Sequence, residues 1–264
     1  MVPRRRALFG GCACLLAGCS GAATQLPLAS EADLRRAQRE VAAGGLPARR
    51  PVSDAEVLAT LRRVRAKLEP AAVQLCRELG IGVCTWRFQA VNDPSLNAGA
   101  GPGGVIVMNR GIVEFARNDD EVAFVMAHEM GHQAANHIAN TQRNVAVGAV
   151  LGALALGALG AAAGSGALAQ SGVEMGAGLG GALGRISFSK EQEREADHLG
   201  AIALHRAGYD LGRARGFLVT MARASGRRET GMLDTHPAGP DRLAAFDVAA
   251  AEIRRTNGAL PRRS

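Results

Sequence analysis

The stretch from Asn118 to His132 reads NDDEVAFVMAHEMGH, and the rest of the chain is arranged around it. It predicts a buried helix that carries a His-Glu-x-x-His motif. At about 100° per residue, His128 and His132 lie one turn apart on one helical face, so two imidazoles can reach one metal ion. Glu129 lies beside them and is placed to act on a metal-activated water rather than to ligate. The motif makes a zinc peptidase the first hypothesis.

The start of this helix is also marked in the sequence. Asn118 is suited to the N-cap position, and Glu121 three residues later resembles the second half of a capping box. The acidic residues Asp119 to Glu121 suit the positive end of the helix dipole. We therefore expect the helix to begin close to Asp119.

A histidine that follows the motif is a first candidate for a third protein ligand. His137 comes nine residues after His128, and nine steps of about 100° place it half a turn away from the metal-facing side. We therefore expect His137 to be a structural or surface histidine.

A second predicted helix offers glutamates as the third ligand. Glu193 and Asp197 share one helical face, so Glu193 can ligate the metal. Asp197 can then accept a hydrogen bond from the distal N–H of a ligand imidazole, for which we expect His128. Glu195 points about 200° away from Glu193. We expect Glu195 on a solvated helix face.

Several motifs together resemble the gluzincin peptidases of the CAAX prenyl protease and HtpX family, with the soluble periplasmic lipoprotein branch as the nearest. The resemblance covers roughly residues 53–250 and supports Glu193 as the third ligand. The residues that carry it are His128-Glu129-Met130-Gly131-His132, Glu193-x-x-Ala196-Asp197-x-x-Gly200, Asn97-Ala98 before Pro102-Gly103-Gly104, and Thr235-His236-Pro237 with Arg242.

The resemblance implies roles for residues outside the zinc motif. Asn97 and Ala98 would belong to an edge strand that takes substrate by β-addition. The family usually has an aromatic residue next, where this chain has Gly99, so the shape of the neighbouring subsite stays open. His236 would stabilise the tetrahedral oxyanion or cover the zinc at rest, and Arg242 would orient the site.

Outside the motif, the pattern predicts a helix-dominated α+β fold of the zincin type with a small antiparallel sheet. Alternation predicts strands, and a helical period predicts helices that flank the motif. Strands are expected at 83–91 and 105–108, a Gly/Pro loop at 97–104, and helices at 30–43, 53–79, 111–116, 188–207, 211–224 and 240–255.

Charge argues against nucleic acid as a partner. The 264 residues carry a formal charge of +7, but three arginines lie in a segment that we expect to be removed. The remaining excess of four basic residues is mild, and basic and acidic residues alternate through 31–79. A solvated surface explains this pattern better than an anionic partner.

The amino terminus predicts a lipoprotein. Residues 1–18 combine three arginines with an apolar run and end in Leu16-Ala17-Gly18-Cys19, which resembles a bacterial lipobox. Cleavage before Cys19 would leave its thiol for lipid attachment, followed by a tether over 19–52 and one zinc peptidase domain over 53–264. Ser20 resembles the sorting residue of outer-membrane lipoproteins. An ordinary signal peptide with a fortuitous cysteine is the alternative.

Two cysteines remain after the predicted processing and lipidation. Export would place Cys76 and Cys84 in an oxidising compartment, and their spacing can satisfy disulfide geometry. Two buried free thiols remain equally compatible with the spacing.

The segment 145–184 is nearly free of charge and rich in alanine and glycine. A spanning helix is one interpretation, because 145–163 is long enough on paper. However, both ends must return to one zinc ion on the same side of a membrane. We therefore expect a mobile helical hairpin that covers the cleft as a lid, and that can rest on the membrane surface.

The residues favour an endopeptidase of the bacterial envelope. One Zn²⁺ per chain would be held by His128, His132 and Glu193, with Glu129 as general base. Misfolded or misassembled envelope polypeptides as substrates, and envelope assembly machinery as a partner, are implied by the resemblance only. A chaperone or assembly factor with a structural zinc site is an alternative, against which an intact Glu129 argues. A membrane-integral prenyl-type protease would need several apolar spans of about 20 residues, which the sequence lacks.

The predicted lipid anchor has a direct test. Cys19→Ser should abolish acyl labelling and release the protein from membranes, because the thiol that carries the lipid is gone. Mass spectrometry of the mature protein measures the modification. Acylation that persists in Cys19→Ser would refute the lipobox interpretation.

Overall fold

The computed structural model describes residues 22–167, 170–171, 173–174, 188–225 and 236–263, and the expected lipidation site Cys19 lies outside them. At its centre is α4 (Asp119–Ala134), of which every residue except Asp119 is buried. The Asn118 side chain caps it by accepting a hydrogen bond from the Glu121 backbone at 3.1 Å. The Glu121 carboxylate binds Arg117 instead of completing a capping box. The predicted helix start is confirmed, whereas the predicted box is only half formed.

A second helix, α7 (Lys190–Arg206), lies directly against α4 and begins with a capping box between Ser189 and Gln192. Glycine allows the two backbones to touch. A Cβ on Gly131 would lie 2.6 Å from the carbonyl oxygen of Ala196, and a Cβ on Gly200 would lie 3.0 Å from the carbonyl carbon of Ala127. Real Cβ atoms essentially never approach as closely as the one on Gly131 would, so a larger residue there requires the helices to shift, and a larger residue at Gly200 requires a smaller adjustment.

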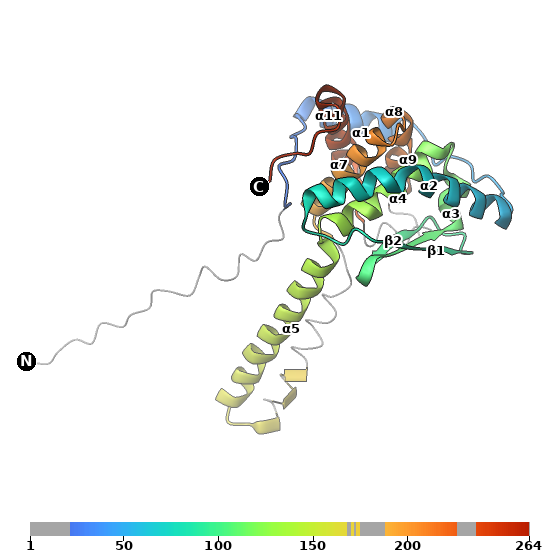
Figure 1. Cartoon of the computed structure of the whole chain (residues 1–264). Helices are drawn as coiled ribbons and strands as arrows, with labels where there is room; N and C mark the ends of the chain where they lie inside the picture. The colour runs from blue at the N-terminus through green and yellow to red at the C-terminus, as the bar shows by residue number, and fades with distance from the viewer. Residues whose placement is uncertain (1–21, 168–169, 172, 175–187, 226–235, 264) are drawn as a thin grey trace, which may run out of the picture.

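Other helices enclose this pair (Figure 1). The predicted helix over 53–79 forms one continuous element with Pro70 inside it. The predicted helix over 211–224 is broken into two at Arg215, whose guanidinium binds Glu40 and Asp247. The surrounding elements are α2 (Asp54–Leu79), α3 (Arg110–Phe115), α8 (Leu211–Ala214), α9 (Gly216–Ala224) and α11 (Pro240–Thr256).

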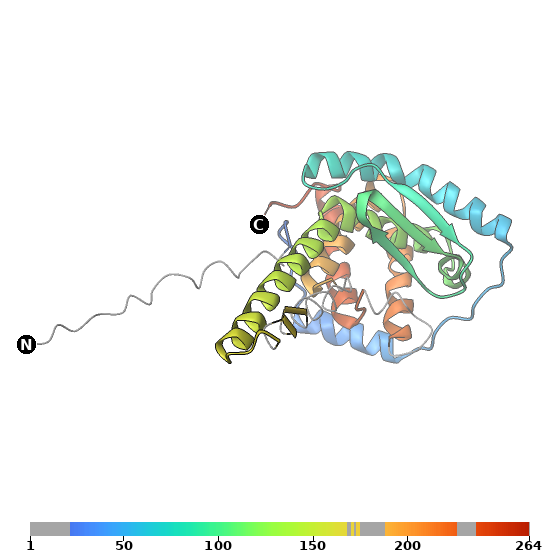
Figure 2. The same cartoon turned by 90° about the horizontal axis from the view of Figure 1, so that it is seen from below.

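A small sheet lies at one side of the helical body (Figure 2). It contains β1 (Arg87–Val91), β2 (Ala98–Gly101) and β3 (Val105–Asn109) in the order β1-β3-β2, with a short 3₁₀ helix, η1 (Pro102–Gly104), between β2 and β3. The expected antiparallel pairing holds for β2 with β3, but β1 is parallel to β3, so the sheet is mixed. The residue pattern predicts a loop over 97–104, because this stretch has no side-chain alternation to mark a strand, whereas the family resemblance implies an edge strand at Asn97 and Ala98; the structure has the edge strand β2 from Ala98.

Cys76 and Cys84 form a disulfide, with their Cα atoms 5.6 Å apart. Cys76 lies in the last turn of α2, and the helix ends at Gly80, which adopts a left-handed conformation with φ of 69°. This turn brings the chain back towards Cys84, because glycine adopts positive φ without steric cost. The structure therefore decides between the two alternatives that the spacing left open.

The segment expected as a tether is packed on the domain from residue 22 onward. The helix α1 (Glu31–Ala42) packs against α11 and α9, and Ala37 on it is buried. Arg223 on α9 donates to backbone carbonyls of Glu40 and Val41. Most residues of α1 are charged or exposed, so the sequence pattern did not indicate that this helix packs on the domain.

The expected lid contains one long helix, α5 (His137–Ala162), which projects away from the body (Figure 1). Val147, Val150 and Leu154 lie on one side of it and are at least half exposed. Its first residue, His137, contacts α4 and α7 through His132 and Glu195, and beyond the first turn the helix projects away from this pair. Part of 163–184 lies outside the described residues. Within the described part of the chain, no helix is long and apolar enough to cross a membrane.

The close contact between α4 and α7 predicts that one added methyl group at Gly131 lowers the stability of the protein. Gly131→Ala should lower the free energy of unfolding by about 1–3 kcal/mol, because the added Cβ meets the α7 backbone and outweighs the gain in helix propensity. Urea unfolding measures the loss. Gly45→Ala is the control, since its Cβ would meet nothing within 4 Å. Equal stability of the two variants would contradict the close packing.

Candidate metal centre

Four buried side chains converge between α4, α7 and the start of the segment that leads into α11. His128, His132, Glu193 and His236 each offer one donor atom, and these atoms lie within 4.8 Å of one another. The Nε2 atoms of His128 and His132 are 3.1 Å apart, and His132 Nε2 is 3.3 Å from Glu193 Oε1. The structure thus brings together the three predicted ligands and His236, which the resemblance also implied at this site.

The donor set fits a zinc ion. Two imidazole nitrogens and one carboxylate oxygen are the protein ligands of many catalytic zinc sites. Burial lowers the pKa of His132 well below its usual value, which keeps its imidazole neutral and able to donate a lone pair. Burial alone raises the pKa of Glu193, but Arg242 and the nearby imidazoles outweigh it and hold the pKa well below its usual range. Glu193 is therefore the ionised donor of the set.

Glu129 lies in the same cluster but has no comparable partners. Its side chain is 0% exposed, and neither carboxylate oxygen has a hydrogen-bond partner among the described residues. The nearest charged neighbour is His236, whose Nε2 is 3.7 Å from Glu129 Oε1. Because buried polar groups are nearly always paired, an unpaired carboxylate next to a set of metal donors fits a group that acts on a water or a substrate.

The distal nitrogen of His128 has the predicted partner. His128 Nδ1 lies 2.9 Å from Asp197 Oδ1, which fixes the imidazole with Nε2 facing the cluster. Arg242 holds Asp197 in turn, through two hydrogen bonds of 2.8 Å from Nε and Nη2. Arg242 Nη1 lies 2.5 Å from Glu193 Oε2. Arg242 therefore positions both carboxylates of α7 that face the cluster.

The distal nitrogen of His132 has a partner that the sequence did not reveal. His132 Nδ1 lies 3.0 Å from His137 Nδ1, and His137 Nε2 lies 3.0 Å from Glu195 Oε2. Of the two expected alternatives, a structural or a surface histidine, His137 is therefore the structural one. The solvated position expected for Glu195 is wrong, because Glu195 is fully buried beneath Ala23 and Thr24. The residues that cover it lie about 170 positions away in the sequence, where no helical pattern can indicate them.

His236 lies inside the cluster. Its Nδ1 is 3.0 Å from Glu193 Oε1 and 3.1 Å from His128 Nε2. Burial lowers the pKa of His236, but the carboxylates of Glu129 and Glu193 outweigh it and raise the pKa. Phe188 closes the other side by stacking on His132, with ring centroids 3.9 Å apart. The cluster is therefore shut off from solvent in this conformation.

The residues expected to take substrate lie beside the metal-facing helix. Ala98 begins β2, which is an edge strand of the sheet, and the Asn97 carbonyl accepts a hydrogen bond from the Asn109 backbone. Gln133 on α4 donates to the carbonyls of Gly101 and Val105 at 2.7 and 3.2 Å. This side chain ties the sheet to the helix that carries the histidines.

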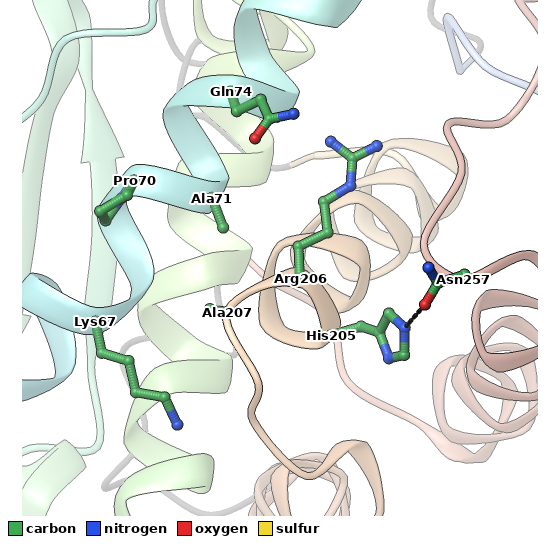
Figure 3. A pocket seen from close by; sticks show the side chains of 8 residues that line it. All are labelled: Lys67, Pro70, Ala71, Gln74, His205, Arg206, Ala207 and Asn257. Carbon is green, nitrogen blue, oxygen red and sulfur yellow. Dashed lines mark hydrogen bonds between the residues drawn. The ribbon is translucent and has the colours of Figure 1, made fainter.

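A large surface cavity, whose lining residues Figure 3 shows, shares no residue with the cluster. It has a volume of about 780 Å³ and is lined by side chains from α2, the end of α7 and the end of α11. Its basic residues already have partners: Arg206 binds Glu78 and the Gly258 carbonyl, and Lys67 binds the Gly208 carbonyl. None of the four metal-donor residues lines this cavity.

Comparison with known proteins agrees with the geometry. The chain is 32% identical over 197 residues to the beta-barrel assembly-enhancing protease of Escherichia coli (strain K12), covering 70% of this chain and 40% of that protein. It is 29% identical over 158 residues to the mitochondrial metalloendopeptidase OMA1 of Arabidopsis thaliana, covering 60% of this chain and 30% of that protein. The chain therefore spans less than half the length of these curated relatives. The model of peptidase family M48 matches residues 59–250, and the chain belongs to this family.

Proposed function

We propose that this protein is a zinc-dependent endopeptidase of the bacterial cell envelope. The observation that carries the proposal is the set of buried donors His128, His132 and Glu193 next to the unpaired carboxylate of Glu129. Membership of a peptidase family gives the reaction class. The donor set and the adjacent base give the means to hydrolyse a peptide bond.

The side chains divide the chemistry between them. His128, His132 and Glu193 would hold one Zn²⁺ per chain. When bound, the ion supplies Lewis-acid chemistry that polarises a carbonyl and lowers the pKa of a water to about 7. Glu129 then acts as general base, takes a proton from the attacking water and passes it to the leaving amine.

His236 would act as a resting cover. Its Nδ1 lies among the donor atoms of Glu193 and His128, where it occupies space that a substrate carbonyl needs. Substrate binding would therefore require this imidazole to move away from Glu193. In the displaced position, an imidazole N–H is suited to stabilise the oxyanion of the tetrahedral intermediate.

The edge strand β2 would bind the substrate in an extended conformation. Addition of a strand to a sheet edge uses backbone hydrogen bonds, so it accepts many sequences, and side-chain pockets then add preference. Asn97 and Ala98 would contribute to this edge. A Cβ at Gly99 would meet nothing within 4 Å, which leaves open space where a substrate side chain can lie.

Three observations support a location in the cell envelope and envelope polypeptides as substrates. Leu16 to Cys19 resembles a lipobox, which would anchor the protein at Cys19, and Ser20 favours the outer membrane. The disulfide between Cys76 and Cys84 suits an oxidising compartment such as the periplasm. Relatives named beta-barrel assembly-enhancing protease suggest misfolded or misassembled envelope proteins as substrates, and the assembly machinery as a partner.

A second candidate is a chaperone or assembly factor with little proteolysis. The complete burial of Glu129 favours it, because a buried base cannot reach a substrate in this conformation. Digestion of casein by the zinc-loaded mature protein separates the two functions. Only the peptidase degrades casein in proportion to bound zinc.

The base is tested by Glu129→Gln. This variant should keep about one zinc per chain and lose at least 99% of casein digestion, because the amide cannot accept the proton of the water. Metal analysis and peptide release are measured on the same sample. Activity above a few per cent of wild type would remove Glu129 from the mechanism.

The third ligand is tested by Glu193→Ala. Loss of a ligand should remove both bound zinc and activity, whereas loss of the base removes activity alone. Glu191→Ala on the same helix is the matched control, since Glu191 is exposed and pairs with Arg194 rather than with a residue of the cluster. A Glu193→Ala protein that retains stoichiometric zinc would show that another side chain is the ligand.

A further inference from the structure

We propose that His137 and Glu195 are positioning residues for His132, and that the N-terminal segment at Ala23 and Thr24 is a required part of this metal centre. The inference rests on the proposed function, because it treats His132 as a zinc ligand. It goes further by making the metal affinity of α4 depend on a segment near the amino terminus.

The orientation of His132 assigns its tautomer. Its Nε2 faces the cluster, 3.3 Å from Glu193 Oε1, so Nε2 is the nitrogen that can ligate. A ligating imidazole carries its proton on the other nitrogen. His132 Nδ1 therefore donates, and His137 Nδ1 at 3.0 Å accepts.

The next proton position follows from the first. Because His137 accepts through Nδ1, its neutral ring carries the proton on Nε2. This nitrogen lies 3.0 Å from Glu195 Oε2 and donates to it. Two imidazoles thus connect the ligating nitrogen to a buried carboxylate, in the arrangement by which an outer carboxylate fixes a ligand imidazole and increases its basicity.

The N-terminal segment holds this carboxylate. Glu195 Oε1 accepts from the Thr24 backbone at 2.7 Å and from the Thr24 hydroxyl at 2.6 Å, and Oε2 accepts from the Ala23 backbone at 3.0 Å. Among the described residues, the only ion-pair partner of Glu195 is His137. Three of the four donors to this carboxylate therefore come from two consecutive residues.

The two ligand imidazoles are supported in different ways. His128 is backed by Asp197, which Arg242 neutralises from within the helical body. His132 is backed through His137 by a carboxylate that depends on hydrogen bonds from Thr24. Displacement of the segment would remove the three hydrogen bonds that fix the Glu195 carboxylate, so His137 and then His132 would lose their fixed orientation.

The C-terminal segment keeps Thr24 in place. Thr24 pairs with Arg263 in an isolated β-bridge, and the Gln25 backbone donates to the Arg262 carbonyl at 2.8 Å. Thr24 itself is buried. The C-terminal segment therefore holds the N-terminal residues that cover Glu195.

The test is zinc affinity, measured by competition with a chelator on the full mature chain. Glu195→Gln and His137→Leu should weaken zinc binding about 10- to 100-fold, the usual effect of losing an outer partner of a ligand. Thr24→Val keeps the shape and the backbone donor but removes the hydroxyl, and it should weaken binding about threefold to tenfold. Glu191→Gln, exposed on the same helix, is the control and should match wild type.

Two further readouts separate positioning from a general loss of structure. Visible absorption of the Co²⁺-substituted protein reports the ligand field, and it should change in Glu195→Gln and His137→Leu. His137→Gln should recover part of the affinity lost in His137→Leu, because an amide can accept from His132 and donate to Glu195.

The possible results distinguish this inference from the proposed function. Wild-type protein that binds no zinc would overturn both. Zinc affinity in Thr24→Val and Glu195→Gln within twofold of wild type, with an unchanged Co²⁺ spectrum, would overturn the positioning role and leave the peptidase proposal standing. Variants that unfold at a lower temperature but keep wild-type zinc affinity would also overturn the positioning role and leave the peptidase proposal standing.

Discussion

The buried guanidinium of Arg242 joins two helices to the centre of the molecule. It comes from α11, donates two hydrogen bonds to Asp197 on α7 and pairs with Glu193 one turn earlier on the same helix. Removal of one partner from a buried ion pair typically costs about 3–5 kcal/mol, because the other charge is left unpaired out of water. The two helices therefore cannot separate without a large cost, and the carboxylate of Glu193 stays directed at the histidines of α4.

The same cluster contains a carboxylate that is not stabilised in this way. Glu129 is as deeply buried as Glu193, but its oxygens have no hydrogen-bond partner among the described residues. A protein selected only for stability would pair or replace such a group. The contrast between two neighbouring glutamates, one held by Arg242 and one without a hydrogen-bond partner among the described residues, supports different roles for them in the proposed reaction.

The close packing of α4 against α7 determines how near the proposed metal-donor atoms lie to one another. The backbones of α4 and α7 touch where Gly131 and Gly200 leave no side chain between them. This contact places His132 within 3.3 Å of Glu193, although the two residues are about sixty positions apart in the chain. The sheet is attached to the same helix through Gln133, so the proposed substrate edge and the donors share one rigid support.

The sequence by itself determined the features that depend on short-range periodicity. The spacing of His128 and His132 places both on one side of a helix, and the spacing of Glu193 and Asp197 does the same on another, so this part of the site could be predicted. The helices α2, α4, α7 and α11 followed from apolar periods and caps in the same way. These features are local, because 3.6 residues per turn fix which side chains share a face.

Only the tertiary structure decided what covers each face. Glu195 lies on the side of α7 that local charge indicated as solvated, yet Thr24 and Ala23 bury it. The parallel pairing of β1, the strand β2 in a Gly-rich stretch and the packing of α1 also depend on partners distant in the sequence. A helical period gives the direction of a side chain but not the segment that will meet it, because that segment is selected by the whole packed core.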